Sequence, residues 1–89
     1  MPLFFSLKNF YSIIIPIFNE VLHLPKLIKE LKIYSLEGHE VIIIDDGSFD
    51  GSFKILSGYE FINLFRFKKN KGKGKAIKKG LLSAKNSKI

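Results

Sequence analysis

The residues Val41-Ile42-Ile43-Ile44-Asp45-Asp46-Gly47-Ser48 join an unbroken β-branched run to an abruptly polar end. A short continuous run of this kind is typical of a strand buried on both faces, as in a parallel sheet covered by helices. The two carboxylates and the Gly-Ser pair would then lie just beyond the carboxyl end of that strand. The run therefore predicts a buried parallel strand that ends in a polar loop.

Similar signals lie on both sides of this strand along the chain. Tyr11–Ile15 is a second β-branched run, and the aromatic segment 61–67 is a third candidate strand. Helices are expected over 24–34, 50–57 and 75–85, where apolar residues recur at helical spacing or follow capping residues. Because parallel strands need crossover helices, the order β-α-β-α-β-α predicts the first half of a doubly wound α/β sheet.

Local signals also predict how these helices begin and pack. Pro25 suits the first turn of its helix, where a missing N–H is tolerated, and Ser48 or Asp50 is expected to cap the short second helix. Gly80 weakens the prediction for the last helix by up to about 1 kcal/mol. The inner face of that helix is predicted to comprise Ala76, Ile77, Leu81 and Ala84.

The charge of the chain is unevenly distributed. Residues 1–65 carry five lysines against eight acidic residues, whereas 66–89 carry nine lysines and Arg66 with no acidic residue. A basic block of this kind usually meets anions such as phosphates, nucleic acid or anionic lipid. The chain has no cysteine, so disulfides and thiolate metal sites are excluded.

Targeting signals are weak. The N-terminus lacks the basic start and the small-residue cleavage site of a signal peptide, and the longest apolar run, Phe10–Phe18, is about half of a ~20-residue membrane span. We expect a cytoplasmic protein, with the cytoplasmic face of a membrane as a surface that it contacts.

Three polar clusters are expected at one edge of the sheet, since ligands of open α/β sheets bind beyond the carboxyl ends of the strands. A strand-end carboxylate can accept an N–H of a uracil or guanine base. Phe18 can stack on a base, which contributes about 1–3 kcal/mol in nucleic-acid complexes. A Gly-Lys turn that opens a helix can bind phosphate. The clusters are Pro16–Glu20, Asp45–Ser48 and Asn70–Gly74.

Each cluster also has a purely structural interpretation. Asp45 and Asp46 can cap the next helix, Phe18 can be a core residue, and Asn19 is better explained as a backbone bracket than as a catalyst. Gly72 and Gly74 can be ordinary turn glycines. The more distant lysines are better explained as a solvated helix face: Lys78, Lys79, Lys85 and Lys88.

Taken together and in order, Ser12–Glu20, Val41–Ser52 and Asn70–Ala76 resemble the family-two glycosyltransferases of GT-A (Rossmann-like) fold. The third motif is most similar to the branch that makes polyprenyl- or dolichyl-phosphate hexoses. The resemblance covers about Tyr11 to Ala84. It implies an N-terminal extension over 1–10 and a partial domain over 11–89 that forms the nucleotide-binding half.

The resemblance implies a nucleotide-diphospho-sugar donor and hexosyl transfer, with a polyprenyl phosphate as a candidate acceptor. Phe18 replaces a tyrosine that is frequent in the family, so stacking remains and a hydroxyl contact is lost. Ile44 would offer a backbone contact, Asp45 would support the ribose and Asp46 would hydrogen-bond the base. The residues implied to line the donor site are Pro16, Phe18, Glu20, Ile44, Asp45, Asp46, Gly72, Lys73 and Gly74.

The chain departs from the family pattern in one respect. The family carries a metal-binding Asp-x-Asp motif for Mg or Mn after the next strand and a catalytic base further on, whereas no Asp follows Asp50 in this sequence. We therefore expect no metal ligand and no catalytic residue here, and an 89-residue chain that is inactive without a missing C-terminal half or an oligomer partner. We also expect the strand at Ile13–Ile15 to present an unpaired apolar edge.

Two other functions compete with this one. Residues 66–89 would suit a small basic nucleic-acid-binding module, although the three motifs would then have no role. A receiver-like signalling domain would use Asp45 and Asp46 as an acidic pocket. That pair would then follow the first strand, and here it follows the second.

Overall fold

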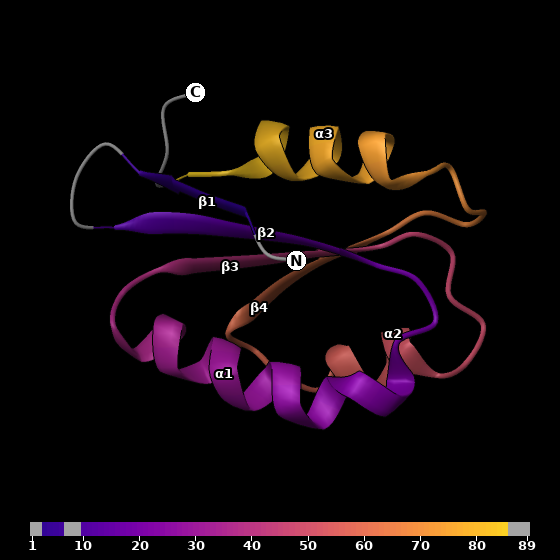
Figure 1. Cartoon of the computed structure of the whole chain (residues 1–89), viewed down its shortest axis with the longest axis horizontal. Helices are drawn as coiled ribbons and strands as arrows, with labels where there is room; N and C mark the ends of the chain where they lie inside the picture. The colour runs from indigo at the N-terminus through magenta and orange to yellow at the C-terminus, as the bar shows by residue number, and fades with distance from the viewer. Residues whose placement is uncertain (1–2, 7–9, 86–89) are drawn as a thin grey trace.

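In a computed structural model, which describes residues 3–6 and 10–85, the chain folds into one sheet between two helical layers (Figure 1). Helices α1 and α2 lie on one face of the sheet and α3 covers the other. The elements are β1 (Leu3–Ser6), β2 (Tyr11–Ile17), the short 3-10 helix η1 (Val21–His23), α1 (Leu24–Leu36), β3 (Glu40–Asp45), α2 (Ser52–Leu56), β4 (Ile62–Arg66) and α3 (Lys73–Ser83). The predicted α/β order from Tyr11 onward is confirmed.

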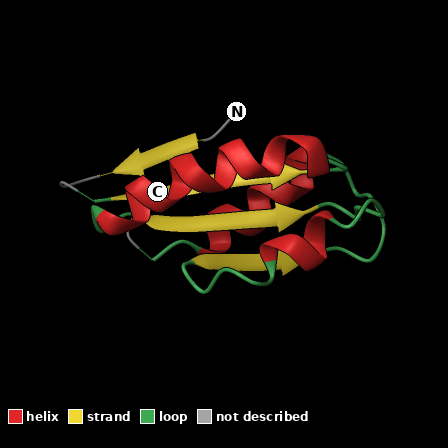
Figure 2. Cartoon of the chain, turned by 90° about the horizontal axis from the view of Figure 1, so that it is seen from below, coloured by secondary structure: helices red, strands yellow, loops and turns green. Residues whose placement is uncertain are grey.

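Strands β2, β3 and β4 are parallel neighbours, and their register aligns their carboxyl ends. Ile17 pairs with Asp45, and Asp45 pairs with Arg66. The longer connections therefore gather at the end of the sheet toward which these strands point (Figure 2). This register places the three predicted polar clusters at one edge.

Strand β1 corrects the expectation of an open edge beside Ile13–Ile15. It pairs antiparallel with β2, with Leu3 opposite Ile14 and Ser6 opposite Tyr11. An antiparallel return needs only a short connection, so a few residues suffice to bring the chain back along its own strand. The edge is covered over Tyr11–Ile14, and residues 3–6 of the predicted extension belong to the sheet. Residues 1–2, 7–9 and 86–89, which include Lys88, lie outside the described part of the chain.

The sheet is buried on both faces because alternate residues of β2 and β3 point to different helices. Ile13 and Ile43 face Leu24, Ile28 and Leu31 of α1. The other face is a smaller cluster formed by Ile14, Ile42, Ile44 and Ala76.

Helix α3 packs on the sheet through a glycine. A Cβ at Gly80 would overlap the side chain of Ile14 and would lie 2.9 Å from Ile44 Cδ1. Gly80, which weakens the helix prediction, is thus the residue that lets α3 approach β2 and β3 closely. Ala76 is fully buried beside it, whereas Ile77, Leu81 and Ala84 are only partly buried.

The helix bounds differ from the predicted ones by a few residues. Helix α1 continues to Leu36, with Pro25 in its first turn as predicted. Helix α3 begins at Lys73 and ends at Ser83, so Lys85 lies beyond it, although Lys78, Lys79 and Lys85 are exposed as predicted. No helix within the described residues is sufficiently long and apolar to traverse a bilayer.

Candidate functional site

A pocket of about 470 Å³ opens beyond the carboxyl ends of β2 and β3. It is bounded by the loop after β2, the loop after β3 and the turn that precedes α3, which are segments far apart in the sequence. Six predicted site residues line it: Pro16, Phe18, Glu20, Asp46, Gly72 and Lys73. The other lining residues are Ile15, Ile17, His23, Leu27 and Asn70.

Three predicted site residues do not line this pocket. Ile44 is buried in the cluster beneath α3, and Asp45 is fully buried. Gly74 lies in the first turn of α3, where a Cβ would meet no atom within 4 Å. The pocket is thus formed by the first and third clusters together with one carboxylate of the second.

Asp46 ties the three segments together. Its two carboxylate oxygens accept hydrogen bonds from the backbone N–H groups of Lys71 (2.7 Å) and Gly72 (3.0 Å). Its own N–H donates to the Ile17 carbonyl at 2.8 Å. The carboxylate that was predicted to meet a base therefore also fixes the Gly-Lys turn, and each oxygen keeps acceptor capacity for a further donor.

The residue after Asp46 makes this contact possible. Gly47 has a φ of 83°, and a Cβ there would lie 2.7 Å from the backbone nitrogen of Asn70. Glycine is the residue that permits both a left-handed backbone and so close an approach. The Asp-Gly pair thus brings the loop after β3 against the turn before α3.

Asp45 has a different environment from that of Asp46. Its Oδ1 accepts the N–H of Ser48 at 2.9 Å, which closes a turn, while Oδ2 is buried and has no hydrogen-bond partner in the described structure. Asp45 is the last residue of β3 and is fully buried, whereas Asp46 is the first residue beyond the strand. Of the two carboxylates, only Asp46 lines the pocket.

Asn19 and Ser48 bracket the first two loops. The Asn19 N–H donates to Ser48 Oγ at 2.8 Å, and its Oδ1 accepts the Phe49 N–H at 2.9 Å. Asn19 has a φ of 51°, a left-handed conformation that asparagine tolerates better than most residues. The prediction of Asn19 as a backbone bracket is confirmed.

Asp50 completes the bracket and holds the start of α2. Its Oδ2 accepts the N–H of Val21 at 3.0 Å, and its Oδ1 accepts the Ser52 hydroxyl at 2.6 Å and the Ser52 N–H at 2.9 Å. The Ser52 hydroxyl is the main cause that lowers the pKa of Asp50, with the two backbone N–H donors adding to it. The N-cap of α2 is Gly51, which makes no side-chain capping bond, so the prediction of Ser48 or Asp50 as the cap is wrong. Asp50 instead accepts the N–H of Ser52, the first residue of the helix.

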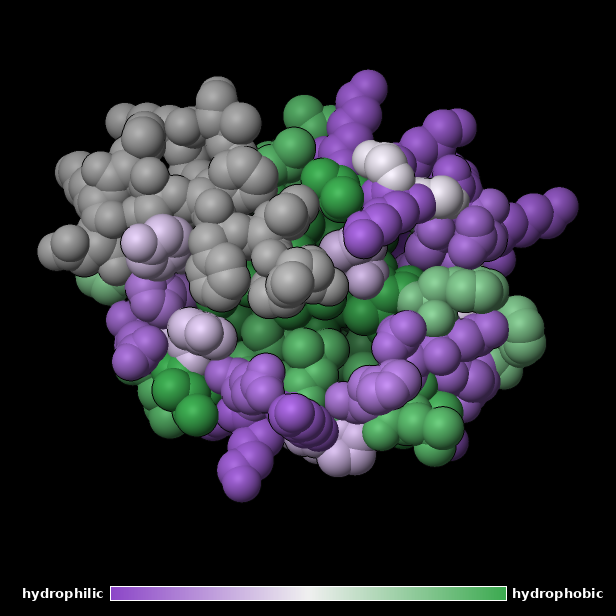
Figure 3. Space-filling view, viewed as in Figure 1, coloured by the Kyte–Doolittle hydropathy of each residue, from purple (hydrophilic) through white to green (hydrophobic). Residues whose placement is uncertain are grey.

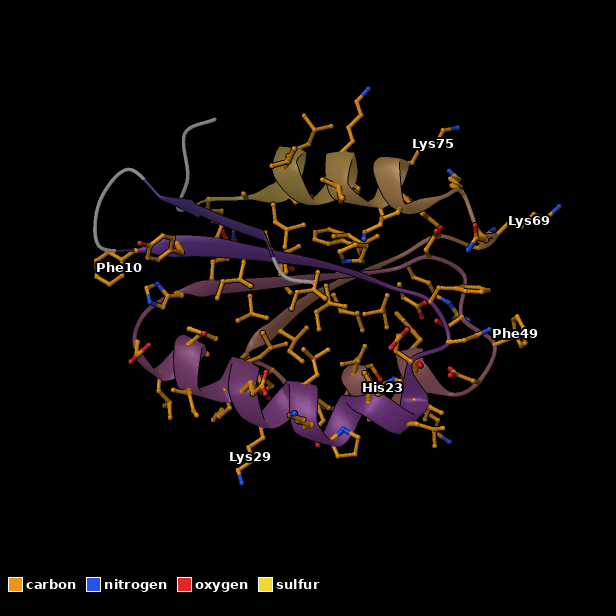
Figure 4. The ribbon with its side chains drawn as sticks, viewed as in Figure 1. Phe10, His23, Lys29, Phe49, Lys69 and Lys75 are labelled. Carbon is orange, nitrogen blue, oxygen red and sulfur yellow. The ribbon has the colours of Figure 1, made fainter. Side chains whose placement is uncertain are left out.

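Aromatic and charged side chains surround the mouth of the pocket. Phe18 is 40% exposed and meets Phe49 edge to face, with ring centroids 5.9 Å apart. Phe49 projects from the same end of the sheet as Lys69 (Figure 4). Glu20 Oε2 lies 3.0 Å from His23 Nδ1, and Lys73 opens α3. The site thus combines the exposed ring of Phe18, the carboxylates of Glu20 and Asp46, and the N-terminus of α3 with its lysines.

The sequence patterns did not point to His23 or Leu27. A lone histidine is predicted to be structural or exposed, and His23 is exposed; it also lines the pocket and pairs with Glu20. Leu27 carries only the apolar spacing of a helix, which does not distinguish a core residue from a pocket wall. Asn70 is the first residue of the third predicted cluster, although the resemblance did not include it among the residues of the donor site.

The described residues do not assemble a metal centre. Within 3–6 and 10–85, no three His, Cys, Asp or Glu side chains lie close enough together to hold an ion. The side chains that line the pocket offer an aromatic face, hydrogen-bonding groups and positive charge.

Comparison with known proteins identifies the family. A family profile described as "Glycosyl transferase family 2" matches residues 12–87. The chain is 36% identical to a dolichyl-phosphate beta-glucosyltransferase of Dictyostelium discoideum, over 85% of this chain and 28% of that protein. It is 32% identical to the Homo sapiens protein of the same name, over 88% of this chain and 28% of that protein.

A relative with another substrate also matches. The chain is 40% identical to a cholesterol galactosyltransferase of Borreliella burgdorferi, over 82% of this chain and 21% of that protein. The chain thus spans between 21% and 28% of the length of these curated relatives. The profile match covers most of the chain, and the chain therefore belongs to glycosyl transferase family 2.

Proposed function

We propose that the pocket binds the nucleotide part of a nucleotide-diphospho-sugar donor, and that the whole protein transfers a hexose from it. The observation that carries this proposal is the pocket itself, in which Phe18, Asp46 and Lys73 from three separate segments line one hollow. Its volume of about 470 Å³ lies within the ~300–1,000 Å³ of ordinary small-molecule sites.

Each part of the pocket suits one part of such a donor. The exposed ring of Phe18 offers a face for the base, and the carboxylates of Glu20 and Asp46 can accept its N–H groups. The phosphates would meet the N-terminus of α3, where free backbone N–H groups and Lys73 supply positive charge. Asp46 acts as a positioning residue as well, because it holds the turn that leads into α3.

The acceptor is proposed from the relatives. Several proteins that the chain resembles are named dolichyl-phosphate beta-glucosyltransferases, which favours a polyprenyl phosphate as the acceptor class. The cholesterol galactosyltransferase among them indicates that a lipid is the feature these substrates share. We propose a lipid acceptor and leave the sugar open.

Calorimetric titration with uridine and guanosine diphosphate sugars tests donor binding. Phe18→Ala removes the stacking face and should weaken binding about tenfold or more. Lys73→Ala should weaken it several-fold, in a salt-dependent manner. Lys78→Ala is the matched control, since Lys78 is an exposed residue of α3 that does not line the pocket. Equal loss in Lys73→Ala and Lys78→Ala, or no binding of any donor, would contradict the proposal.

A basic nucleic-acid-binding module is the alternative, and the exposed lysines of residues 68–79 are what favours it. The same titration with single-stranded RNA separates the two functions. Tight, salt-sensitive RNA binding that Phe18→Ala leaves unchanged, together with indifference to nucleotide sugars, would favour the alternative.

A further inference from the structure

Segments beside the pocket carry apolar side chains that the fold leaves in solvent. Leu22 of η1 is 88% exposed and Phe49 is 83% exposed, and Phe18 stands edge to face against Phe49. Isolated surface apolar residues are ordinary, whereas several exposed apolar residues on segments beside one site indicate an interaction surface. These three residues are here called the apolar tip.

The backbone holds the apolar tip in place. The N–H of Val21, next to Leu22, donates to Asp50, and the N–H of Phe49 donates to Asn19. The segment after β2 and the loop after β3 are therefore held together by hydrogen bonds, and their exposed side chains project from an ordered backbone. A partner would meet these side chains without first having to order the backbone.

Lysines adjoin the apolar tip on the third segment of the pocket. The tight approach of Gly47 to Asn70 places this segment against the loop that carries Phe49. In Figure 4, Lys69 and Phe49 extend from the same end of the molecule, and Figure 3 shows apolar residues beside hydrophilic ones at that end. The exposed lysines of this segment, here called the lysine rim, are Lys68, Lys69, Lys71, Lys73 and Lys75.

Acidic groups at the same end are already engaged. Glu20 pairs with His23, and Asp50 accepts hydrogen bonds from Val21 and Ser52. Asp46 is bound to the backbone of the Gly-Lys turn. The electrostatic potential outside the lysine rim is therefore positive, and an anionic surface would be attracted to it.

We infer that this end of the molecule docks on an anionic lipid bilayer, with the apolar tip in the headgroup region and the lysine rim on lipid phosphates. Interfacial binding combines buried apolar area with attraction to anionic lipid, and both requirements are met here. A nucleic acid would explain the lysines and a stacked phenylalanine. It would leave the aliphatic side chain of Leu22 in solvent.

The inference deepens the proposed function, because docking at this end would present the mouth of the donor pocket to a lipid acceptor. The two proposals can be tested separately, because membrane binding needs no nucleotide sugar. Vesicle binding and donor binding can therefore fail separately.

Sedimentation with phosphatidylcholine vesicles, with and without phosphatidylglycerol, tests the docking. The 89-residue chain should bind the anionic vesicles preferentially and release them as salt is raised. A Leu22→Ser/Phe49→Ser variant should bind at least about tenfold more weakly. A Lys68→Glu/Lys69→Glu variant should lose at least about tenfold and should lose most of the anionic preference.

Matched controls come from the opposite end of the sheet and from the other face. Leu36→Ser changes an apolar residue that is 75% exposed at the end of α1, and Lys29→Glu/Lys32→Glu reverses two exposed lysines further along the same helix. Both controls should bind vesicles like the unmodified chain, and circular dichroism should show every variant folded.

Three results would overturn the inference. They are equal loss in the controls, no preference for anionic vesicles, and RNA binding that depends on Lys68 and Lys69 without any vesicle binding. The last of these would assign the rim to nucleic acid.

Discussion

At the scale of single residues, glycine and aspartate determine how closely the segments of this molecule approach. Gly80 lets α3 rest on Ile14 and Ile44, and Gly47 lets the loop after β3 reach Asn70. Asp46 and Asp50 then use carboxylate oxygens to satisfy backbone N–H groups of other segments. Residues of the predicted motifs, such as Asp46 and Gly47, therefore hold the pocket segments together in addition to any contact with a ligand.

Gly80→Ala should destabilise the fold by about 1–3 kcal/mol, because the added methyl group overlaps Ile14 and crowds Ile44 beneath α3. Gly74→Ala, in the same helix but with open space around it, should be between neutral and about 1 kcal/mol more stable. Urea unfolding of both variants measures the difference. Equal stabilities would show that α3 does not pack on the sheet through Gly80.

Asp50 should make the fold sensitive to acid. Its pKa in the folded protein is lowered below the ordinary value of 3.8, chiefly by the Ser52 hydroxyl, so its contribution is present above that pH. The contribution should fade as the pH falls from 3.8 through the lowered pKa. The melting temperature of the unmodified chain should exceed that of Asp50→Asn at neutral pH, and the two should converge in acid. A difference in melting temperature that persists at the lowest pH would show that hydrogen-bond geometry, and not ionisation of Asp50, accounts for the stabilisation.

At the scale of elements, unbroken β-branched runs sufficed to predict β2 and β3, because burial on both faces imposes that composition. The aromatic segment 61–67 predicted β4, and apolar residues at helical spacing predicted α1. Strand β1 was missed for a physical reason. A four-residue edge strand that returns antiparallel needs neither a crossover helix nor a long apolar run. Strand β1 forms because it pairs with the free edge of β2, and the local sequence of Leu3–Ser6 does not indicate that pairing.

The Gly-Lys turn should be held as an element by Asp46. In Asp46→Ala the N–H groups of Lys71 and Gly72 lose their acceptors, so their hydrogen exchange should accelerate markedly. Lys73→Ala leaves both acceptors in place and serves as the control. Amide exchange followed by NMR reads each N–H directly. Protection that survives in Asp46→Ala would mean that another group orders the turn.

Removal of residues 1–6 should expose the edge of β2 that β1 covers. Unpaired N–H and C=O groups along an apolar strand favour pairing with a second copy, so the shortened chain should associate in a concentration-dependent manner. Analytical ultracentrifugation against the unmodified chain measures this. A shortened chain that stays monomeric at every concentration would show that β1 is dispensable for protecting the edge.

At the scale of the whole molecule, parallel order and register explain why distant motifs meet. Once β2, β3 and β4 were predicted as parallel, their carboxyl ends had to share one edge, so the meeting of the three polar clusters followed from topology. The family resemblance supplied Phe18, Asp46 and Lys73 as individual lining residues. The contacts of Asp46 with the Gly-Lys turn did not follow, because backbone hydrogen bonds across loops depend on exact geometry. The resemblance implied that Asp45 supports the ribose, whereas the structure buries this residue and leaves it out of the pocket lining.

We propose above that three separate segments form one nucleotide-binding pocket, and NMR mapping of donor binding is the sharpest test of this. Titration of the isotopically labelled chain with a nucleotide-diphospho-sugar should shift the backbone amides of Phe18, Glu20, Gly72 and Lys73 together, with one common saturation curve. Amides of Leu36 and Glu37 at the far end of α1 should not move. Shifts confined to one segment, shifts spread over the exposed lysines of α3, or no shifts with any donor would contradict the claim.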